Sequence, residues 1–89
     1  MNHYLIDVRD EAEYGQGHIE GALNISLNEI QSRSQQLLNI PKDAGIILYC
    51  ASGNRAGMAQ TSLKSMGYTN VVNGVNQTQV LATYPEYSQ

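Results

Sequence analysis

The segment from Ile46 to Tyr49 carries four large apolar side chains in a row. Because no polar residue alternates with them, the strand that they predict must be covered on both faces, as strands are inside a parallel sheet. The mostly apolar stretch from Tyr4 to Val8 predicts a second buried strand. Segments with helical spacing separate the expected strands, and this alternation indicates an α/β fold with a largely parallel sheet.

Caps and apolar spacing predict three helices. Asp10 with Glu13 is an aspartate version of the capping box and predicts a brief helix to about residue 14. Ser26 with Glu29 is a full capping box, and the apolar stripe after it predicts one helix to about residue 39. A second stripe over residues 56–66 predicts a helix that stops at Gly67, since glycine is favoured just after a helix end.

The remaining segments are expected to be short. Residues 22–25 and 68–72 have the composition of strands, residues 80–82 that of a short helix, and the tail from residue 84 is expected to be frayed. The 89 residues suffice for one hydrophobic core, so we expect a single domain over residues 1–89.

Composition and charge exclude several kinds of protein. The 42% apolar and 15% charged residues are typical of a folded globular chain. The apolar runs are far shorter than the ~20 residues that a membrane-spanning helix needs. Five basic against eight acidic residues give a net charge of −3, which argues against a nucleic-acid partner. With one cysteine and no Cys/His cluster, we expect neither an intramolecular disulfide nor a metal site.

Cys50 is the candidate catalytic residue. It follows the central strand and precedes the next helix by about five residues, and ligands of open α/β sheets bind in such places. A helix N-terminus and a nearby cation, here Arg55, lower the pKa of a thiol, while Gly53 lets the loop turn with positive φ. We therefore expect a solvent-reachable thiolate inside a ring of amide donors that binds an anion. The residues expected to bind the substrate are Ala51, Ser52, Gly53, Asn54, Arg55 and Ala56.

Other interpretations of these residues stay open. A lone cysteine at the end of an apolar strand is often a packing residue, although packing requires neither Gly53 nor Arg55. Asp7 and Arg9 are expected to support the site as a hydrogen-bonded pair that braces neighbouring loops, rather than to act in catalysis. His18 lies in a loop with two glycines and is expected to fix that loop rather than to act as a base.

Three motifs resemble those of the single-domain rhodaneses, the thiosulfate sulfurtransferases. Residues 50–55, with the sequence CASGNR, resemble the active-site loop of that family. The DVR segment at 7–9, together with Glu13 and GHIEGA at 17–22, is similar to its N-terminal motifs, and MGY at 66–68 to its late helix-to-strand junction. The resemblance implies a three-layer fold in which helices flank a mainly parallel central sheet.

The resemblance also implies a reaction. Cys50 would take the outer sulfur of thiosulfate as a persulfide and pass it to cyanide, a small thiol or a protein thiol. The loop amides would hold the negative charge and Arg55 would attract thiosulfate, without a metal or an organic cofactor. We expect a monomer with neither a nucleic-acid nor a membrane partner.

The small size and short start of the chain resemble the phage-shock-protein-E type of rhodanese, which is exported and loses a signal peptide. This resemblance favours the periplasm over the cytoplasm. The chain departs from the family after the last expected strand, because GVNQ at 74–77 replaces the usual Gly-Gly segment and no tryptophan follows. This departure affects how the C-terminal segment is expected to pack and which residues are expected to form the rim of the pocket.

Two other functions compete with this one. The first is a cysteine-type phosphatase, whose active-site loop resembles this one but has its arginine six positions after the cysteine. Here Arg55 stands only five positions after Cys50, so the loop is one residue short. The second competitor is a rhodanese-like module that carries a persulfide or binds a partner without catalysis. An intact Cys50 in an intact loop argues against a role in binding alone.

Overall fold

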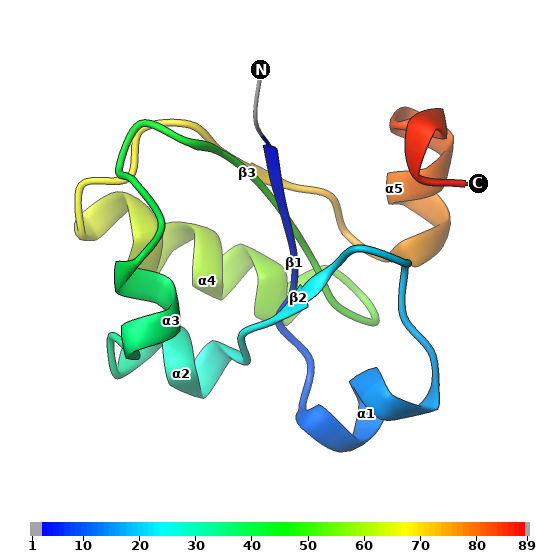
Figure 1. Ribbon diagram of the computed structural model, residues 1–89, viewed down its shortest axis with the longest axis horizontal. Helices are drawn as coiled ribbons and strands as arrows, with labels where there is room; N and C mark the ends of the chain where they lie inside the picture. The colour runs from blue at the N-terminus through cyan, green and yellow to red at the C-terminus, as the bar shows by residue number, and fades with distance from the viewer. Residues whose placement is uncertain (1–2, 89) are drawn as a thin grey trace.

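The computed structural model describes residues 3–88, in which four parallel strands form one sheet (Figure 1). The order across the sheet is β2 (Leu23–Asn24), β1 (His3–Asp7), β3 (Gly45–Tyr49) and β4 (Val71–Asn73). β3 pairs with β1 along its whole length and with β4 on its other side. The predicted central strand therefore lies inside the sheet, and the predicted α/β class is confirmed.

Helices cover both faces of the sheet, as Figure 1 shows. On one face lie α2 (Leu27–Gln31), α3 (Gln35–Leu38) and α4 (Asn54–Ser65). On the other face lie α5 (Gln77–Thr83) and a short 3₁₀ turn over residues 85–87. The first helix, α1 (Glu11–Gln16), lies beyond the carboxyl end of β1.

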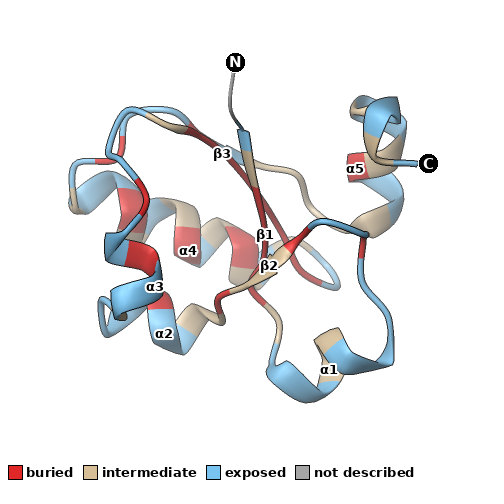
Figure 2. Ribbon diagram, in the orientation of Figure 1, coloured by how far each residue is buried: buried red, intermediate tan, exposed pale blue. Residues whose placement is uncertain are grey.

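The strand side chains divide between two apolar clusters, because successive residues of a strand point to opposite faces. Ile46, Leu48 and Cys50 pack on the face covered by α4, whereas Ile47 and Tyr49 pack on the face covered by α5. Figure 2 shows the buried residues along the centre of the sheet and on the inner side of α4. Cys50 and Tyr49, although adjacent in the chain, therefore face different environments.

The helix expected from residue 26 to about residue 39 is divided in two, so that prediction was wrong in its middle. Ser26 caps α2 as expected, with its hydroxyl oxygen accepting from the Glu29 amide. The chain then turns at Arg33, which has φ 56°, and Ser34 caps a new helix by accepting from the Leu37 amide at 3.4 Å. Serine competes with the helical backbone for hydrogen bonds, which explains the break.

The end of α4 agrees with the sequence, but the strand after it begins later than expected. Gly67 has φ 100°, and the Tyr68 amide donates to the Leu63 carbonyl at 3.0 Å, as in a Schellman cap. Tyr68 itself is buried outside β4, and its hydroxyl lies 3.1 Å from the carbonyl oxygens of Leu37 and Ile40. The predicted strand at 68–72 is therefore replaced by the shorter β4.

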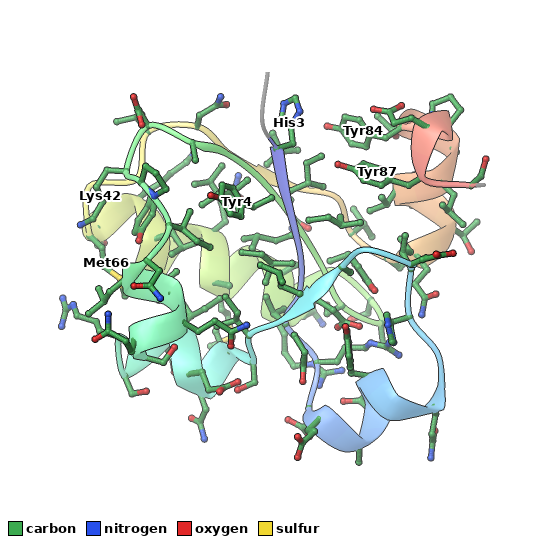
Figure 3. The ribbon with its side chains drawn as sticks, viewed as in Figure 1. His3, Tyr4, Lys42, Met66, Tyr84 and Tyr87 are labelled. Carbon is green, nitrogen blue, oxygen red and sulfur yellow. The ribbon has the colours of Figure 1, made fainter. Side chains whose placement is uncertain are left out.

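The C-terminal segment packs against the molecule, so the expected frayed tail was wrong for the described residues. The rings of Tyr84 and Tyr87 meet edge to face with centroids 6.4 Å apart and pack against the second cluster (Figure 3). This aromatic contact supplies the apolar surface that fixes a short terminal turn.

Candidate active site

Cys50 stands directly after β3, and the three residues that follow it turn the chain into α4. Gly53 is the residue before the first turn of α4 and has φ 93° and ψ −10°. Its backbone N–H donates to the Cys50 Sγ at 3.0 Å. A side chain at position 53 would be strained in this conformation, so glycine is what allows the amide to reach the sulfur.

The surroundings of Cys50 favour the thiolate over the thiol. Burial raises the pKa of the Cys50 thiol, but hydrogen bonds from the backbone amides of Ala56, Ser52, Gly53 and Arg55 lower it, and the net result is a pKa below the ordinary value of 9. The amide dipoles at the start of a helix supply this kind of anion stabilisation. The loop can therefore hold a negative charge on sulfur.

Cys50 is only 2% exposed, which differs from the expected solvent-reachable thiol. The alternation along β3 turns its side chain toward the same face as Leu48, where the loop and Ala56 at the start of α4 cover it. The sequence pattern located the residue at the strand end. It carried no information on which way the side chain would point.

The other residues of the loop differ in how far they are exposed to solvent. Ala51, Ser52 and Asn54 are exposed, whereas Gly53 and Arg55 are half-buried. The Ala56 side chain is fully buried and packs into the core beneath α4. The small residues at 51 and 52 leave the outer side of the loop open to solvent.

Arg55 is held by Glu13, a contact that the residue pattern did not predict. Nη1 donates to Oε1 of Glu13 at 2.7 Å and Nη2 donates to Oε2 at 3.1 Å, so both outer nitrogens of the guanidinium are engaged. The hydrogen bond from Arg55, with a second one from the Asp10 backbone, lowers the pKa of Glu13 to about 2. The charge of the cation beside the loop is therefore partly neutralised by Glu13.

Asp7 and Arg9 form the pair that the sequence suggested. Nε of Arg9 donates to both carboxylate oxygens of Asp7, at 3.0 and 3.1 Å, and Nη2 donates to Oδ2 at 2.8 Å. Nη2 also donates to the Gly17 carbonyl at 2.6 Å, which ties the loop after α1 to the end of β1. Because Asp7 is fully buried, the pair has the geometry of a structural brace.

Tyr49 and His18 lie on the same side of the sheet as α5, away from the Cys50 side chain. The Tyr49 hydroxyl accepts from the Ile19 amide at 3.1 Å, and burial raises the pKa of Tyr49 to about 12. Nδ1 of His18 lies 2.8 Å from the Tyr14 carbonyl oxygen, and the two rings stack with centroids 3.6 Å apart. Both residues fix the segment that follows α1.

Asn73, the last residue of β4, and Val75, two residues beyond it, complete the surroundings of the loop. Nothing in the residue pattern indicated either contact. The amide side chain of Asn73 donates to the Gly53 carbonyl at 3.2 Å, and the Val75 carbonyl accepts from the Cys50 amide at 3.0 Å. Val75 lies in the GVNQ segment that departs from the family pattern. The departure therefore adjoins the candidate nucleophile.

A cavity of about 570 Å³ lies away from Cys50, since no residue of the loop 50–56 lines it. Its lining residues are Asp10, Glu11, Tyr14, Leu23, Asn24, Ser26, Glu29 and Gln36. Within residues 3–88, no group of three or more His, Cys, Asp or Glu side chains is placed to hold a metal ion. No helix in the same part of the chain has both the length and the apolar character needed to cross a membrane.

Fold and site together define an α/β domain that holds a cysteine sulfur at the start of a helix. Residues 1–75 match the family model described as a rhodanese-like domain, and the chain belongs to that family. A solved structure described as a rhodanese with anions from Escherichia coli has a TM-score of 0.77 and 35% identity, and the match covers 88% of this chain and 91% of that one.

Curated relatives agree with this family. Thiosulfate sulfurtransferase PspE of Escherichia coli is 40% identical over 70 residues, which cover 79% of this chain and 66% of the relative. Adenylyltransferase and sulfurtransferase uba4 of Ogataea parapolymorpha is 35% identical over 89 residues, covering 94% of this chain and 22% of the relative. The chain thus spans less than two thirds of the length of each of these two relatives.

Proposed function

We propose that this protein is a thiosulfate sulfurtransferase that uses Cys50 as its nucleophile. The observation that carries the proposal is the 3.0 Å hydrogen bond from the Gly53 amide to the Cys50 Sγ, at the start of a helix whose amides lower the thiol pKa. A thiolate is the reactive form of cysteine, and the same amides stabilise a persulfide anion. The solved relative described as a rhodanese with anions supports an anionic donor.

In the first step, the Cys50 thiolate attacks the outer sulfur of thiosulfate. A new S–S bond forms as the bond from that sulfur to the sulfite sulfur breaks, and sulfite leaves with the bonding electron pair. The product is a Cys50 persulfide anion, so the total charge is unchanged. Because the nucleophile is already ionised, the step needs no general base.

In the second step, a thiophilic acceptor removes the outer sulfur and restores the Cys50 thiolate. Cyanide would leave as thiocyanate, and the thiolate of a small molecule or a protein would leave as its own persulfide. The Arg55–Glu13 pair stands at the start of α4, where its guanidinium contributes positive potential for an arriving or departing anion.

An intact mass measured after incubation with thiosulfate tests the proposal. The protein should gain the mass of one sulfur atom, and cyanide should remove it. The Cys50→Ser variant, which keeps the size of the side chain, should gain nothing and should release no sulfite. An unmodified wild-type Cys50, or sulfite release by the serine variant, would overturn the assignment.

A persulfide carrier for a protein partner is the second candidate. It is favoured by the small share, 22%, that this chain covers of uba4, since a domain of this kind can be one part of a larger sulfur-transfer protein. A carrier would gain one sulfur from thiosulfate but would show little multiple turnover with cyanide or small thiols. Repeated thiocyanate production therefore separates an enzyme from a carrier.

A further inference from the structure

Four hydrogen bonds form a closed ring that begins and ends at Cys50. The Cys50 amide donates to the Val75 carbonyl at 3.0 Å, and the Val75 amide donates to Oδ1 of Asn73 at 2.9 Å. Nδ2 of Asn73 donates to the Gly53 carbonyl at 3.2 Å, and the Gly53 amide donates to the Cys50 Sγ at 3.0 Å. We call these four residues the Asn73 ring. One side chain thus links the segment after β4 to the loop after β3.

Val75 has a backbone conformation that its residue type rarely adopts. Its φ is 76°, in the left-handed region, where a β-branched side chain is a true outlier. Such a conformation persists only where the surroundings fix it, and such residues concentrate at functional sites. Here the Val75 amide is fixed by its hydrogen bond to Asn73. A Cβ atom placed on Gly53 would lie only 3.1 Å from Cγ1 of Val75, so the segment after β4 is in close contact with the loop after β3.

Gly53 is the residue of the ring that most needs an external support. A glycine samples far more backbone conformations than other residues, so its amide would not stay aimed at the sulfur by local geometry alone. The carbonyl of this same residue accepts from the Gly57 amide at 2.9 Å, as part of the first turn of α4, and from Nδ2 of Asn73 at 3.2 Å, which is the support from outside the helix. Asn73 is itself placed by its pairing with Leu48 in the β3–β4 ladder, and its Nδ2 is close to Gly57 of α4.

We propose that Asn73 is a positioning residue that holds the Gly53 amide on the sulfur of Cys50 throughout sulfur transfer. Asn73 acts through the loop and does not contact the sulfur. The inference rests on the proposed role of Cys50 as the nucleophile and adds a residue to it. When Asn73 is lost, the Gly53 carbonyl keeps only its hydrogen bond from the Gly57 amide. The Gly53 amide is then less well aimed at the sulfur, and one donor to the anionic thiolate and persulfide is weakened.

The test compares Asn73→Leu with Gln60→Leu. Leucine has the same branching and the same number of side-chain heavy atoms as asparagine, although it is bulkier. It removes both hydrogen bonds without adding a charge that would itself change the ionisation of Cys50. Gln60 is the matched control, because its Nε2 also joins α4 to β4, donating to the Val71 carbonyl at 3.0 Å, outside the ring. The readout is the rate of Cys50 alkylation by iodoacetamide, a neutral reagent, as a function of pH.

In Asn73→Leu, the midpoint of the alkylation profile should rise by about one pH unit, because one hydrogen bond to the anionic sulfur is weakened. At a pH below the midpoint, alkylation should therefore slow about tenfold. The Gln60→Leu midpoint should equal that of the wild type. An unchanged midpoint in a folded Asn73→Leu protein, with or without a lower thermal unfolding temperature, would overturn the proposal and leave Asn73 a structural residue.

Asn73→Ala provides a second variant, since it places no added bulk near Gly57 and should show the same rise in midpoint. Alkylation uses no thiosulfate, so its result stands apart from the proposed function. A wild type that forms no persulfide would refute the sulfurtransferase, whereas equal midpoints in the wild type and both Asn73 variants would refute the positioning role of Asn73.

Discussion

At the scale of single residues, the ionisation of Cys50 is decided by two opposing effects. Burial at 2% exposure disfavours a charged sulfur, whereas the four amides of the loop and of the first turn of α4 favour it. A hydrogen bond to a charged group contributes about 1.5–3 kcal/mol, and one pKa unit corresponds to about 1.4 kcal/mol. Several such donors therefore suffice to offset the burial, and the pKa falls.

Glu13→Gln tests the ion pair beside the loop through its pH dependence. The pKa of Glu13 falls from 4.5 to about 2 because of Arg55, so in the wild type the pair stabilises the folded state above about 4.5. This stabilisation is lost as the pH falls through about 2. The difference in unfolding free energy between the wild type and Glu13→Gln should therefore shrink as the pH is lowered through this range in urea titrations.

Glu11→Gln is the matched control for this experiment. Glu11 stands in the same first turn of α1 and has the same favourable interaction with the helix dipole, but it is exposed and lacks the contact to Arg55. A pH-dependent difference of the same size in both variants would assign the effect to the helix dipole instead of to the ion pair.

At the scale of elements, α4 is flanked by two glycines in the left-handed region, Gly53 just before its first residue and Gly67 two residues after its last. The first aims an amide at Cys50, and the second closes the Schellman cap that leads to Tyr68. Lys42 adds to this end of the helix, since its Nζ donates to the Met66 carbonyl at 2.7 Å (Figure 3). The orientation of α4, and with it the loop, is therefore fixed at both ends.

The same substitution should have opposite effects at two glycines. Gly67→Ala should lower the unfolding free energy by about 1–2 kcal/mol, because alanine is strained at φ 100° although the space around it is open. Gly15→Ala should raise it by about 0.5–1 kcal/mol, because Gly15 lies inside α1, with nothing near the position of an added Cβ. Urea unfolding curves measure both, and equal signs would contradict this account.

Local patterns predicted the elements whose ends are determined locally. The apolar run that forms β3, the Ser26 cap and the glycine after α4 all lie where the sequence indicated. The break before Ser34 escaped prediction because the apolar stripe continues across it, while the serine side chain competes for the backbone. β4 starts late because tertiary burial of Tyr68 outweighs its preference for a strand.

The candidate site, like the fold, was predictable only where it depends on local sequence. Cys50 and Gly53 follow from a strand end that leads into a helix, which is a local pattern. Glu13 meets Arg55 across 42 residues and Asn73 meets Gly53 across 20, so only the folded chain brings these pairs together. The charge of Arg55 could have suggested an acidic partner, but nothing in the sequence singled out Asn73.

At the scale of the whole molecule, the two faces of the sheet are covered unequally. α4 buries Ala56, Ala59 and Leu63 on one face, whereas Val80 is the buried residue of α5 on the other. Segments with few buried apolar contacts open at lower free energy than the rest of a fold. The face covered by α5 is therefore the less stable one.

Amide hydrogen exchange should reveal this difference. The amides of α5 should exchange faster than those in the middle of α4, because α5 can open without unfolding the sheet. Mass spectrometry of peptides from the two helices measures the exchange. Equal protection of the two helices would mean that the molecule opens as one unit and would contradict this expectation.

The cover over Cys50 has a chemical consequence. A sulfur that lies beneath its own loop is reached more readily by small molecules such as cyanide than by bulky ones. Bulky disulfides are therefore hindered at the sulfur, whereas an oxidant as small as hydrogen peroxide is not. The same few residues that make the sulfur reactive thus also slow the formation of mixed disulfides, one of the side reactions to which an ionised thiol is prone.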